Sequence, residues 1–157
     1  MQCGKKTLEP IRLNLHMKNQ LQKSLVAIAL LTIISPYCSA DVNFIVTGIQ
    51  HNRGSIDIRI FLDAESWLKD DQILEHLIIP AKKGSVSVTL ENFRGGKMAA
   101  SVYHDENGDG KLNTGLFWRP KEGFAFSNNY EPRAMPQFSK AAIQIADGEN
   151  VSVRLNY

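Results

Sequence analysis

Cysteine is nearly absent from this chain of 157 residues, because Cys3 and Cys38 are the only two and both fall within the first forty positions. The remaining 117 residues can therefore form no internal disulfide, and a hydrophobic core or a bound ion must supply their stability. Long apolar runs are absent too: LVAIALLTII (25–34) covers ten residues, whereas a membrane-spanning helix needs about twenty. We expect no transmembrane segment after residue 40.

The first forty residues have the pattern of a cleaved secretory signal. A basic lead-in precedes the apolar run, which ends in SPYCSA with small side chains at Cys38 and Ala40. This order is typical of a signal peptide and predicts cleavage after Ala40, leaving a domain of residues 41–157 that is periplasmic or secreted. Met17 is an alternative start, since the signal is already complete from there. Lipidation of Cys38 is not expected, because the bulky Tyr37 stands where a lipoprotein signal needs a small residue.

An excess of positive charge is missing once the leader is removed. The leader holds five of the 18 Lys and Arg and one of the 16 acids, so 13 basic side chains face 15 acidic ones, a net charge of −2. No basic stripe with interleaved aromatic residues is left, which argues against nucleic-acid binding. The motifs HExxH and GxSxG and a phosphate-binding glycine loop are also absent.

Alternation of apolar and polar residues with period two predicts strands. We expect seven extended segments, at 42–49, 55–63, 76–81, 85–93, 97–105, 141–147 and 151–157. Turn signals predict one hairpin from the first two segments and another from the last two. The sequence therefore predicts an all-β fold, a single antiparallel β-sandwich of about seven strands, immunoglobulin-like or transthyretin-like.

The alternation also assigns faces to the predicted strands. In segment 55–63 it places on the core side Ile56, Ile58, Ile60 and Leu62, and on the solvent side Ser55, Asp57 and Arg59. A short helical turn capped by Asp63 follows and should fold Trp67 and Leu68 back onto the core.

The exception is segment 105–140, whose 36 residues show no sustained alternation and contain three prolines and six aromatic residues. Irregular segments of this length are uncommon in compact domains and usually carry function. The aromatic content argues against disorder. Something should therefore tie this segment to the domain.

The segment opens with HDENGDGKLNTG (104–115), which has the spacing of an EF-hand calcium loop. Oxygen-bearing groups alternate around a glycine at position six, and the candidate ligands are Asp105, Asn107, Asp109, the Lys111 carbonyl and Asn113. Leu116 stands at position twelve in place of a bidentate acid, so Glu122, or as a weaker candidate Glu106, would have to complete the set. The alternative is a metal-free polar turn built on the Asn-Gly and Asp-Gly steps.

A second surface of the segment combines aromatic side chains with amides and charges, which suits recognition of a sugar or a peptide. Its members are Lys121, Phe124, Phe126, Asn128, Asn129 and Tyr130. The alternative is that the aromatic residues pack the segment onto the sheet while the amides satisfy its backbone.

Other candidates for chemistry are weaker. The three histidines after residue 40, His51, His76 and His104, would form a zinc site only if the fold gathered them. Asp105 and Glu122 could act as the carboxylate pair of a glycosidase, but acids in such a loop more often form turns or bind calcium.

The motif HDENGDGKLNTG followed by RPKEGFAFSNN, together with VTGI, IRIFLD and SVYHD, resembles a bacterial family of uncharacterised exported proteins, DUF2141. The likeness covers nearly all of residues 42–155. It implies a signal-bearing, single-domain β-sandwich with no established activity. Asn113 departs from the family pattern, which usually has Asp there, and residues 116–118 are bulkier than typical.

Two functions remain open at this point. The first is an exported, non-catalytic module of the bacterial envelope that binds an envelope protein or a glycan through segment 105–140 and is stabilised by calcium. The second is a small envelope hydrolase that uses the loop acids. Binding without turnover would identify the first, and turnover that is lost in Asp105→Asn would identify the second.

Overall fold

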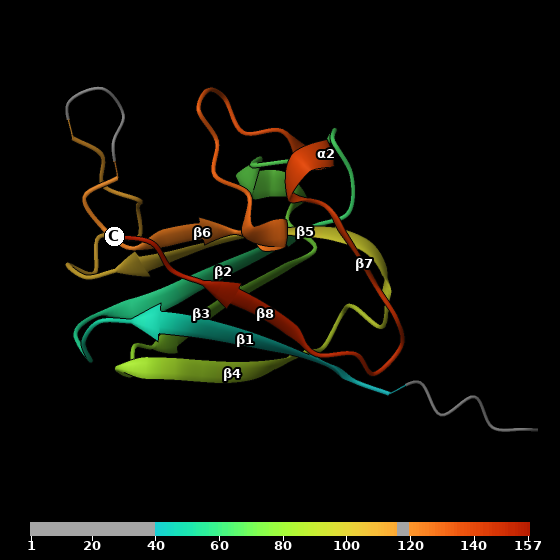
Figure 1. Cartoon of the computed structure of the whole chain (residues 1–157), viewed down its shortest axis with the longest axis horizontal. Coiled ribbons are helices and arrows are strands. Elements are labelled where there is room, and N and C mark those ends of the chain that lie inside the picture. Colours follow the sequence, from blue (N-terminus) through green and yellow to red (C-terminus); the bar gives the residue numbers. More distant parts are fainter. Residues whose placement is uncertain (1–39, 116–119) are drawn as a thin grey trace, which may run out of the picture. The chain divides into compact units, whose positions relative to one another are not determined.

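The computed structural model describes residues 40–115 and 120–157. Within the compact unit Ser39–Tyr157 the chain forms strands joined by short helical turns (Figure 1). The strands are β1 (Val42–Ile49), β2 (Ser55–Phe61), β3 (Glu75–Pro80), β4 (Gly84–Leu90), β5 (Gly96–Asp105), β6 (Phe124–Phe126), β7 (Ile143–Ile145) and β8 (Val151–Arg154). The helical elements are η1 (Asp70–Gln72), η3 (Ser127–Asn129) and α2 (Phe138–Ala141).

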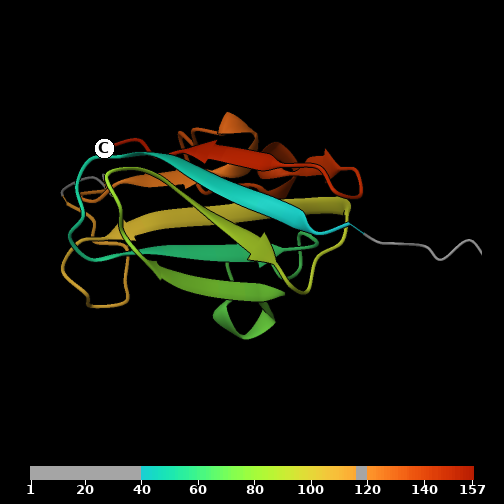
Figure 2. The same cartoon turned by 90° about the horizontal axis from the view of Figure 1, so that it is seen from below.

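The strands form two sheets. The first has the order β4-β1-β8, and the second the order β3-β2-β5-β6 with β7 also paired to β5. Among the described strands, β1 and β8 are the parallel pair and the other pairs are antiparallel. Figures 1 and 2 show the strands of the two sheets from two directions. The expected all-β sandwich is confirmed.

The two predicted hairpins are wrong. β1 pairs with β4 and β8, whereas β2 pairs with β3 and β5, so the turn at residues 50–54 carries the chain from one sheet to the other. In the same way β7 pairs with β5 while β8 pairs with β1. A glycine-containing turn reverses the chain but does not decide whether the next strand lies beside the first or faces it across the core. Here both strands bury an apolar face, and facing each other satisfies both.

The main core lies between the sheets and follows the predicted alternation. Val42, Phe44 and Val46 of β1 are fully buried, and the same cluster contains Ile56, Ile58, Ile60, Met98, Ala100 and Val102. Leu62 is a correction, because it lies just beyond the end of β2 and is 43% exposed. Asp57 is another: it lies on the face away from the core, as predicted, yet it is only 2% exposed, because other side chains cover that face.

A second apolar cluster covers part of the outer face of the five-stranded sheet. It contains Phe61, Ala99, Phe126, Phe138 and Ala141, with Trp67 packed against it. The predicted cap is present, since the Asp63 carboxylate accepts the Ser66 N–H at 2.8 Å. Leu68, however, has a positive φ of 59° and is 40% exposed, so of the two residues expected to fold back only Trp67 does so.

The described part of segment 105–140 is more ordered than its sequence indicates. β6, η3 and α2 lie in or at the end of it. Ser127 fastens them to the sheet, because its hydroxyl accepts the Ala100 N–H at 2.8 Å and donates to the Ala141 carbonyl at 2.6 Å. Over the described part of the chain, no helix has the length and apolar character needed to cross a membrane.

Candidate functional site

The loop after β5 is organised by the Asp105 carboxylate. Asp105 is the last residue of β5 and is 4% exposed. Its two oxygens accept backbone N–H groups from Gly108 at 2.7 Å, Asp109 at 3.3 Å and Gly110 at 2.8 Å. The chain can turn this tightly because Gly108 and Gly110 have positive φ values of 76° and 74°, which glycine adopts without a steric penalty.

The Asp109 carboxylate accepts hydrogen bonds from amide groups of the loop. Asn107 and Asn113 each donate a side-chain N–H to its Oδ2 at 3.0 Å, and the Lys111 N–H reaches its Oδ1 at 2.9 Å. Hydrogen bonds from Asn113 and Asn107 lower the pKa of Asp109 below its ordinary value, so this exposed carboxylate is charged at neutral pH.

Glu122 follows Asn113 by nine residues in the sequence, and its side chain contacts the loop. It is 6% exposed. Its Oε2 accepts the Asn113 backbone N–H at 2.9 Å and the Asn113 side chain at 3.3 Å, and its Oε1 accepts the Glu106 N–H at 3.1 Å. Leu116, the residue at position twelve of the loop, lies outside the described residues.

Asp105, Asp109 and Glu122 are therefore linked to one another through the backbone and side chain of Asn113 and the loop amides. Carboxylate, amide and carbonyl oxygens are the ligands that Ca²⁺ prefers. Each carboxylate oxygen has more than one lone pair, so the present hydrogen bonds leave capacity for an ion. The Lys111 carbonyl contacts the Asn113 amide at 3.5 Å, at the margin of a hydrogen bond.

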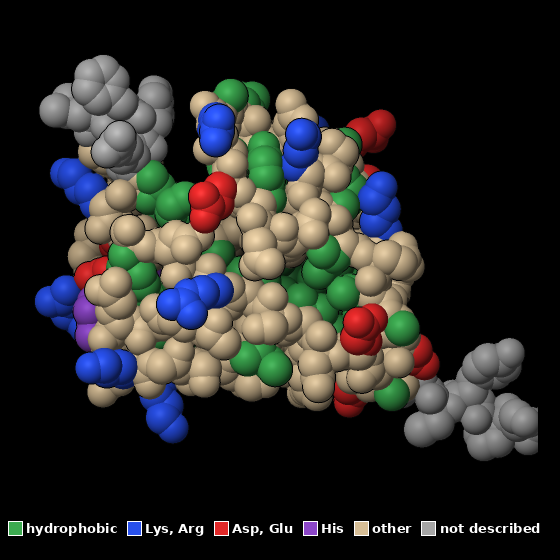
Figure 3. All heavy atoms as spheres, in the orientation of Figure 1, with side chains coloured by type: hydrophobic (Ala, Val, Ile, Leu, Met, Phe, Trp, Pro, Cys, Tyr) green, Lys and Arg blue, Asp and Glu red, His purple; other side chains and the backbone are tan. Residues whose placement is uncertain are grey.

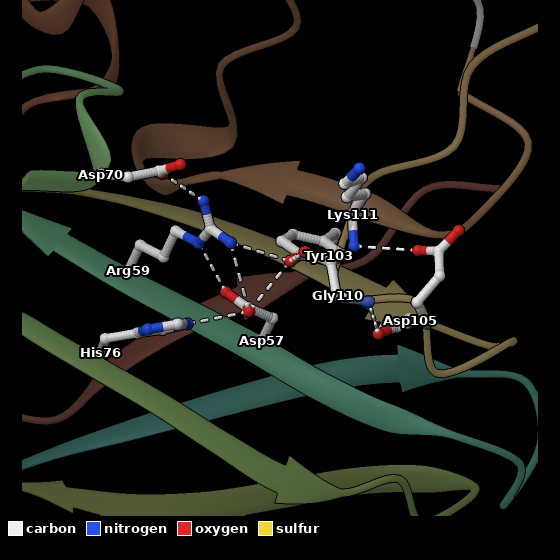
Figure 4. Close-up of polar contacts among 9 residues, drawn as sticks. Asp57, Arg59, Asp70, His76, Tyr103, Asp105, Gly110 and Lys111 are labelled. Carbon is white, nitrogen blue, oxygen red and sulfur yellow. Dashed lines mark hydrogen bonds and ion pairs between the residues drawn. The ribbon is translucent and has the colours of Figure 1, made fainter.

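A buried polar network lies next to this loop, on the outer face of the five-stranded sheet (Figure 4). Asp57 of β2 is at its centre. Its carboxylate accepts bonds from Arg59 at 2.8 Å, His76 at 2.8 Å and Tyr103 at 2.9 Å. Arg59 in turn contacts Asp70 at 2.7 Å. The network joins β2, β3, β5 and η1.

Tyr103 connects the network to the loop. Its hydroxyl lies 2.9 Å from Asp57 and 3.0 Å from the Gly110 carbonyl, and it accepts an N–H of Arg59 at 2.9 Å. Burial raises the pKa of Tyr103, and so does its hydrogen bond to Asp57. The hydroxyl therefore keeps its one proton, which lies between the Asp57 carboxylate and the Gly110 carbonyl.

Sequence reasoning missed this network. The available signal was the pair Asp57 and Arg59 at alternate positions of one strand, opposite Tyr103 and His76 on neighbouring strands. Alternation shows that Asp57 and Arg59 share a face, but only the strand register shows which side chains they meet.

At the C-terminal end of β5, on the face of the sheet opposite to Tyr103, the side chains of His104 and Glu106 lie close to His51 from the turn after β1. The His51 Nε2 lies 2.9 Å from the Glu106 carboxylate, which also accepts an N–H of Arg53 at 2.9 Å. The rings of His51 and His104 are 4.6 Å apart. Burial alone would raise the pKa of Glu106, but hydrogen bonds from Arg53 and His51 outweigh it and lower that pKa.

The C-terminal tail completes this end of the domain. The Tyr157 hydroxyl lies 2.7 Å from the His104 Nδ1, and its ring covers Gly123, where a Cβ would come within 2.5 Å of it. Phe124 and Asn156 exchange backbone hydrogen bonds at 2.8 and 2.9 Å. Three distant parts of the chain are therefore joined here: residues 50–54, residues 104–106 with 122–124, and residues 155–157.

A shallow hollow of about 590 Å³ opens beside the loop. The residues that line it all have polar or charged side chains: Arg53, Glu106, Asn107, Asn113, Lys121 and Glu122. The Lys121 side chain is exposed. Figure 3 shows acidic, basic and histidine side chains gathered at the end of the molecule where the C-terminus lies.

The structure divides the predicted aromatic and amide surface. Lys121 lines the hollow, whereas the other five members do not. Phe126 is 8% exposed, and Phe124 and Tyr130 pack against the second apolar cluster with it. Asn128 donates its amide to the Lys140 carbonyl at 2.9 Å. Asn128 and Asn129 are exposed, with positive φ values of 60° and 49°.

The three histidines are not gathered into one site. His51 and His104 lie together, but His76 belongs to the Asp57 network, because it pairs with Arg59 on the outer face while His104 pairs with Ile56 on the core face. Glu106, not His76, is the third member of the histidine cluster.

Comparison with known proteins identifies a family but no characterised relative. No curated protein and no solved structure matches the chain. The family model described as uncharacterized protein conserved in bacteria (DUF2141) matches residues 45–154, which include β1 from its fourth residue, the loop, the buried network and β8. The chain belongs to the DUF2141 family of bacterial proteins.

Proposed function

We propose that this protein is an exported, non-catalytic module of the bacterial envelope that binds a glycan or a protein partner at the hollow beside the β5–β6 loop. The observation that carries the proposal is the hollow itself. The start of segment 105–140 supplies five of its six lining residues, and the rest of the segment is fastened to the sheet by Ser127 and the second apolar cluster. The start of segment 105–140 therefore forms a polar opening, and the rest of the segment is attached to the sheet.

The lining suits a ligand rich in hydroxyl groups. An amide donates through its nitrogen and accepts through its oxygen, and a carboxylate accepts through both oxygens, which is how planar side chains bind vicinal hydroxyls. Lys121 and Arg53 add two cations at the rim, and within the described part of the chain no side-chain partner is found for Lys121. A glycan or a polar peptide fits this chemistry better than an apolar ligand.

A calcium ion in the loop is part of the proposal. Asp105, Asn107, Asp109, Asn113 and Glu122, with the Lys111 carbonyl, would supply the oxygen ligands that a hard cation requires. Three of these side chains also line the hollow. The three carboxylates of the candidate set would have to move toward one another, because the group gathered within 4.8 Å in the described residues is that of His51, His104 and Glu106. An ion in the loop would hold the lining in place and would add positive charge beside it.

The loop acids are poorly arranged for hydrolysis. A glycosidase needs one carboxylic acid that gives a proton to the leaving group and one carboxylate that faces the sugar. Asp105 and Glu122 are both buried and both accept several N–H groups of their own loop. This supports a binding role over the hydrolase alternative.

Export remains a proposal that rests on the leader pattern of residues 1–40, nearly all of which lie outside the described residues. Intact-mass analysis of the native protein should find an unlipidated N-terminus at Asp41. An acylated Cys38 at the terminus, or an uncleaved leader, would contradict it.

Binding is tested by measuring capture of envelope glycans and of proteins from an envelope extract on the immobilised protein. Lys121→Ala should lower affinity by at least about tenfold, the loss expected of one well-placed charged contact. Asn129→Ala is the matched control, since Asn129 is equally exposed but lies outside the hollow.

The outcomes separate the alternatives. Loss of capture in Asn129→Ala or Tyr130→Ala, with Lys121→Ala unchanged, would move the site to the aromatic and amide surface. Turnover of an envelope sugar that disappears in Asp105→Asn would show that the protein is a hydrolase.

A further inference from the structure

The cluster of His51, His104 and Glu106 is distinct from the calcium loop, although both are built at the end of β5. Successive residues of a strand point to opposite faces. His104 therefore points toward the core side while Asp105 points to the outer side, where the loop folds around it. The loop offers oxygen atoms, whereas this cluster offers two imidazoles and one carboxylate.

The ligand atoms of the cluster are close enough for one ion. One atom from each of His51, His104 and Glu106 lies within 4.8 Å of the other two, and the His51–Glu106 contact is 2.9 Å. Ligands bound to zinc at about 2.0–2.1 Å in a tetrahedron are about 3.4 Å apart. Side-chain shifts of roughly 1–1.5 Å would bring the set to that geometry.

The hydrogen bonds of His104 already place its proton as in a metal ligand. The His104 Nε2 lies 2.6 Å from the Arg53 carbonyl, which can only accept, so Nε2 carries the hydrogen. The lone pair is then on Nδ1, where the Tyr157 hydroxyl donates at 2.7 Å. A metal-binding histidine commonly donates its second nitrogen to a backbone carbonyl in this way, which fixes the ring and its tautomer.

We propose that His51, His104 and Glu106 form a binding site for a divalent cation that prefers imidazole, with Zn²⁺ as the representative ion. Two histidines and a glutamate are a recurrent zinc set that leaves a fourth position open. That position is on the side of the hollow, because Glu106 and Arg53 line it. The inference does not rest on the calcium site or on the proposed ligand.

The groups that must move for the ion to enter are at the surface. Tyr157 is 47% exposed, and the Arg53 side chain, which must release Glu106, is 71% exposed. His51 must shift its proton from Nε2 to Nδ1, which gives up its 2.9 Å hydrogen bond to Glu106 and its 3.3 Å contact with the Arg53 N–H. Because the ion competes with protons for both imidazoles, affinity should fall as pH is lowered.

The test is a titration of the chelator-treated, untagged protein with Zn²⁺ by calorimetry, and with Co²⁺ by absorption spectroscopy, which reports tetrahedral nitrogen and oxygen ligands. One equivalent should bind. His51→Ala and Glu106→Gln should each weaken binding by at least about 100-fold, since even groups behind the ligands are worth roughly 10- to 100-fold. His104→Ala is avoided because His104 is fully buried and its loss would disturb the fold.

Two further variants control the result. His76→Gln removes the histidine of the Asp57 network and should leave binding unchanged. Tyr157→Phe removes the hydroxyl that competes for the His104 Nδ1 and should bind the metal equally well or more tightly. The proposal is overturned if no binding occurs up to roughly 1 mM metal, about −4 kcal/mol, if binding survives in both His51→Ala and Glu106→Gln, or if His76→Gln or Tyr157→Phe abolishes it.

Discussion

Single residues on the outer face of β2 show how burial can be decided by neighbours and not by the strand pattern. Asp57 is 2% exposed although alternation places it away from the core. Its carboxylate is held by Arg59, His76 and Tyr103. Removing a charge from water costs several kcal/mol, so the partners are what make this position tolerable. Deleting one side of such a set is more damaging than its net contribution suggests.

We therefore expect Asp57→Ala to lower the free energy of unfolding by about 2–3 kcal/mol, because Arg59 and Tyr103 lose a hydrogen bond to a buried charge. Arg59 keeps Asp70 and Tyr103 keeps the Gly110 carbonyl. Asp70→Ala is the control. Asp70 contacts the same Arg59 at 2.7 Å, but its side chain is 81% exposed, and such pairs contribute about 1 kcal/mol or less. Urea denaturation of both variants measures the difference. Equal losses in the two variants would show that the network is not a buried unit.

The raised pKa of Tyr103 predicts how the free energy of unfolding changes at alkaline pH. Burial and the bond to Asp57 raise its pKa in the folded protein, so the folded state binds this proton more tightly than the unfolded chain. Stability is unaffected below the ordinary tyrosine pKa of about 10 and falls as pH rises above it. In urea unfolding at increasing pH, the wild type should lose stability more steeply than Tyr103→Phe.

Some alkaline slope should remain in Tyr103→Phe, because burial also raises the pKa of Tyr157. Identical slopes in wild type and Tyr103→Phe would contradict the assignment of the buried proton to Tyr103.

The positions of the strands could be predicted from the sequence, but the pairing between strands could not. Alternation is a property of a few consecutive residues, and β1 was predicted with the bounds that it has, Val42–Ile49. The pairing of a strand depends on which other elements bury its two faces, and the local sequence pattern does not show this. β6 was missed because its three residues, Phe124–Phe126, are too few to show alternation. They are also apolar on both faces, because one face packs against the main core and the other against the second apolar cluster.

The candidate site likewise contains residues that local spacing reveals and residues that only the fold brings together. The candidate ligands of the loop were named from the sequence because their spacing is local, and Glu122 because it is the nearest acid that follows. That they bind calcium stays a prediction. The cluster of His51, His104 and Glu106 could not be found, since His51 lies 53 residues before His104 and meets it only when the turn after β1 closes against β5.

That closure depends on Gly54, where a Cβ would come within 1.9 Å of the Asp105 carbonyl oxygen at a φ of 75°. Gly54→Ala should lower the free energy of unfolding by about 3 kcal/mol, the sum of an unfavourable φ of about 1 kcal/mol and a steric clash of about 2 kcal/mol. Gly84→Ala is the matched control, because Gly84 has a φ of 99° and nothing within 4 Å of the added Cβ.

Gly84→Ala should therefore cost only the backbone term, about 1 kcal/mol. Both variants are compared by urea denaturation. If Gly54→Ala is no worse than Gly84→Ala, the turn is free to move away from β5, and the histidine cluster is not rigidly assembled.

At the scale of the whole molecule, the segments that join the strands meet at one end without a disulfide. The turn after β1, the loop after β5 and the C-terminal tail contact one another there through His104, Gly123 and Tyr157. The loop oxygens lie beside this junction, and the hollow opens between them. An ion held in the loop would therefore stabilise the region that we propose binds the ligand.

The most direct test of the account is a thermal melt of the chelator-treated protein with and without calcium. For an extracellular-type site with a Kd near 0.1 mM, calcium at roughly 1 mM should add about 1.4 kcal/mol and raise the melting midpoint by about 6 °C. Magnesium should do much less, because it needs a rigid octahedron and gives up its water reluctantly. Asp109→Ala should abolish the calcium shift, whereas Asp70→Ala should keep it. A wild-type midpoint that does not move at several millimolar calcium would show that residues 104–115 form only a polar turn.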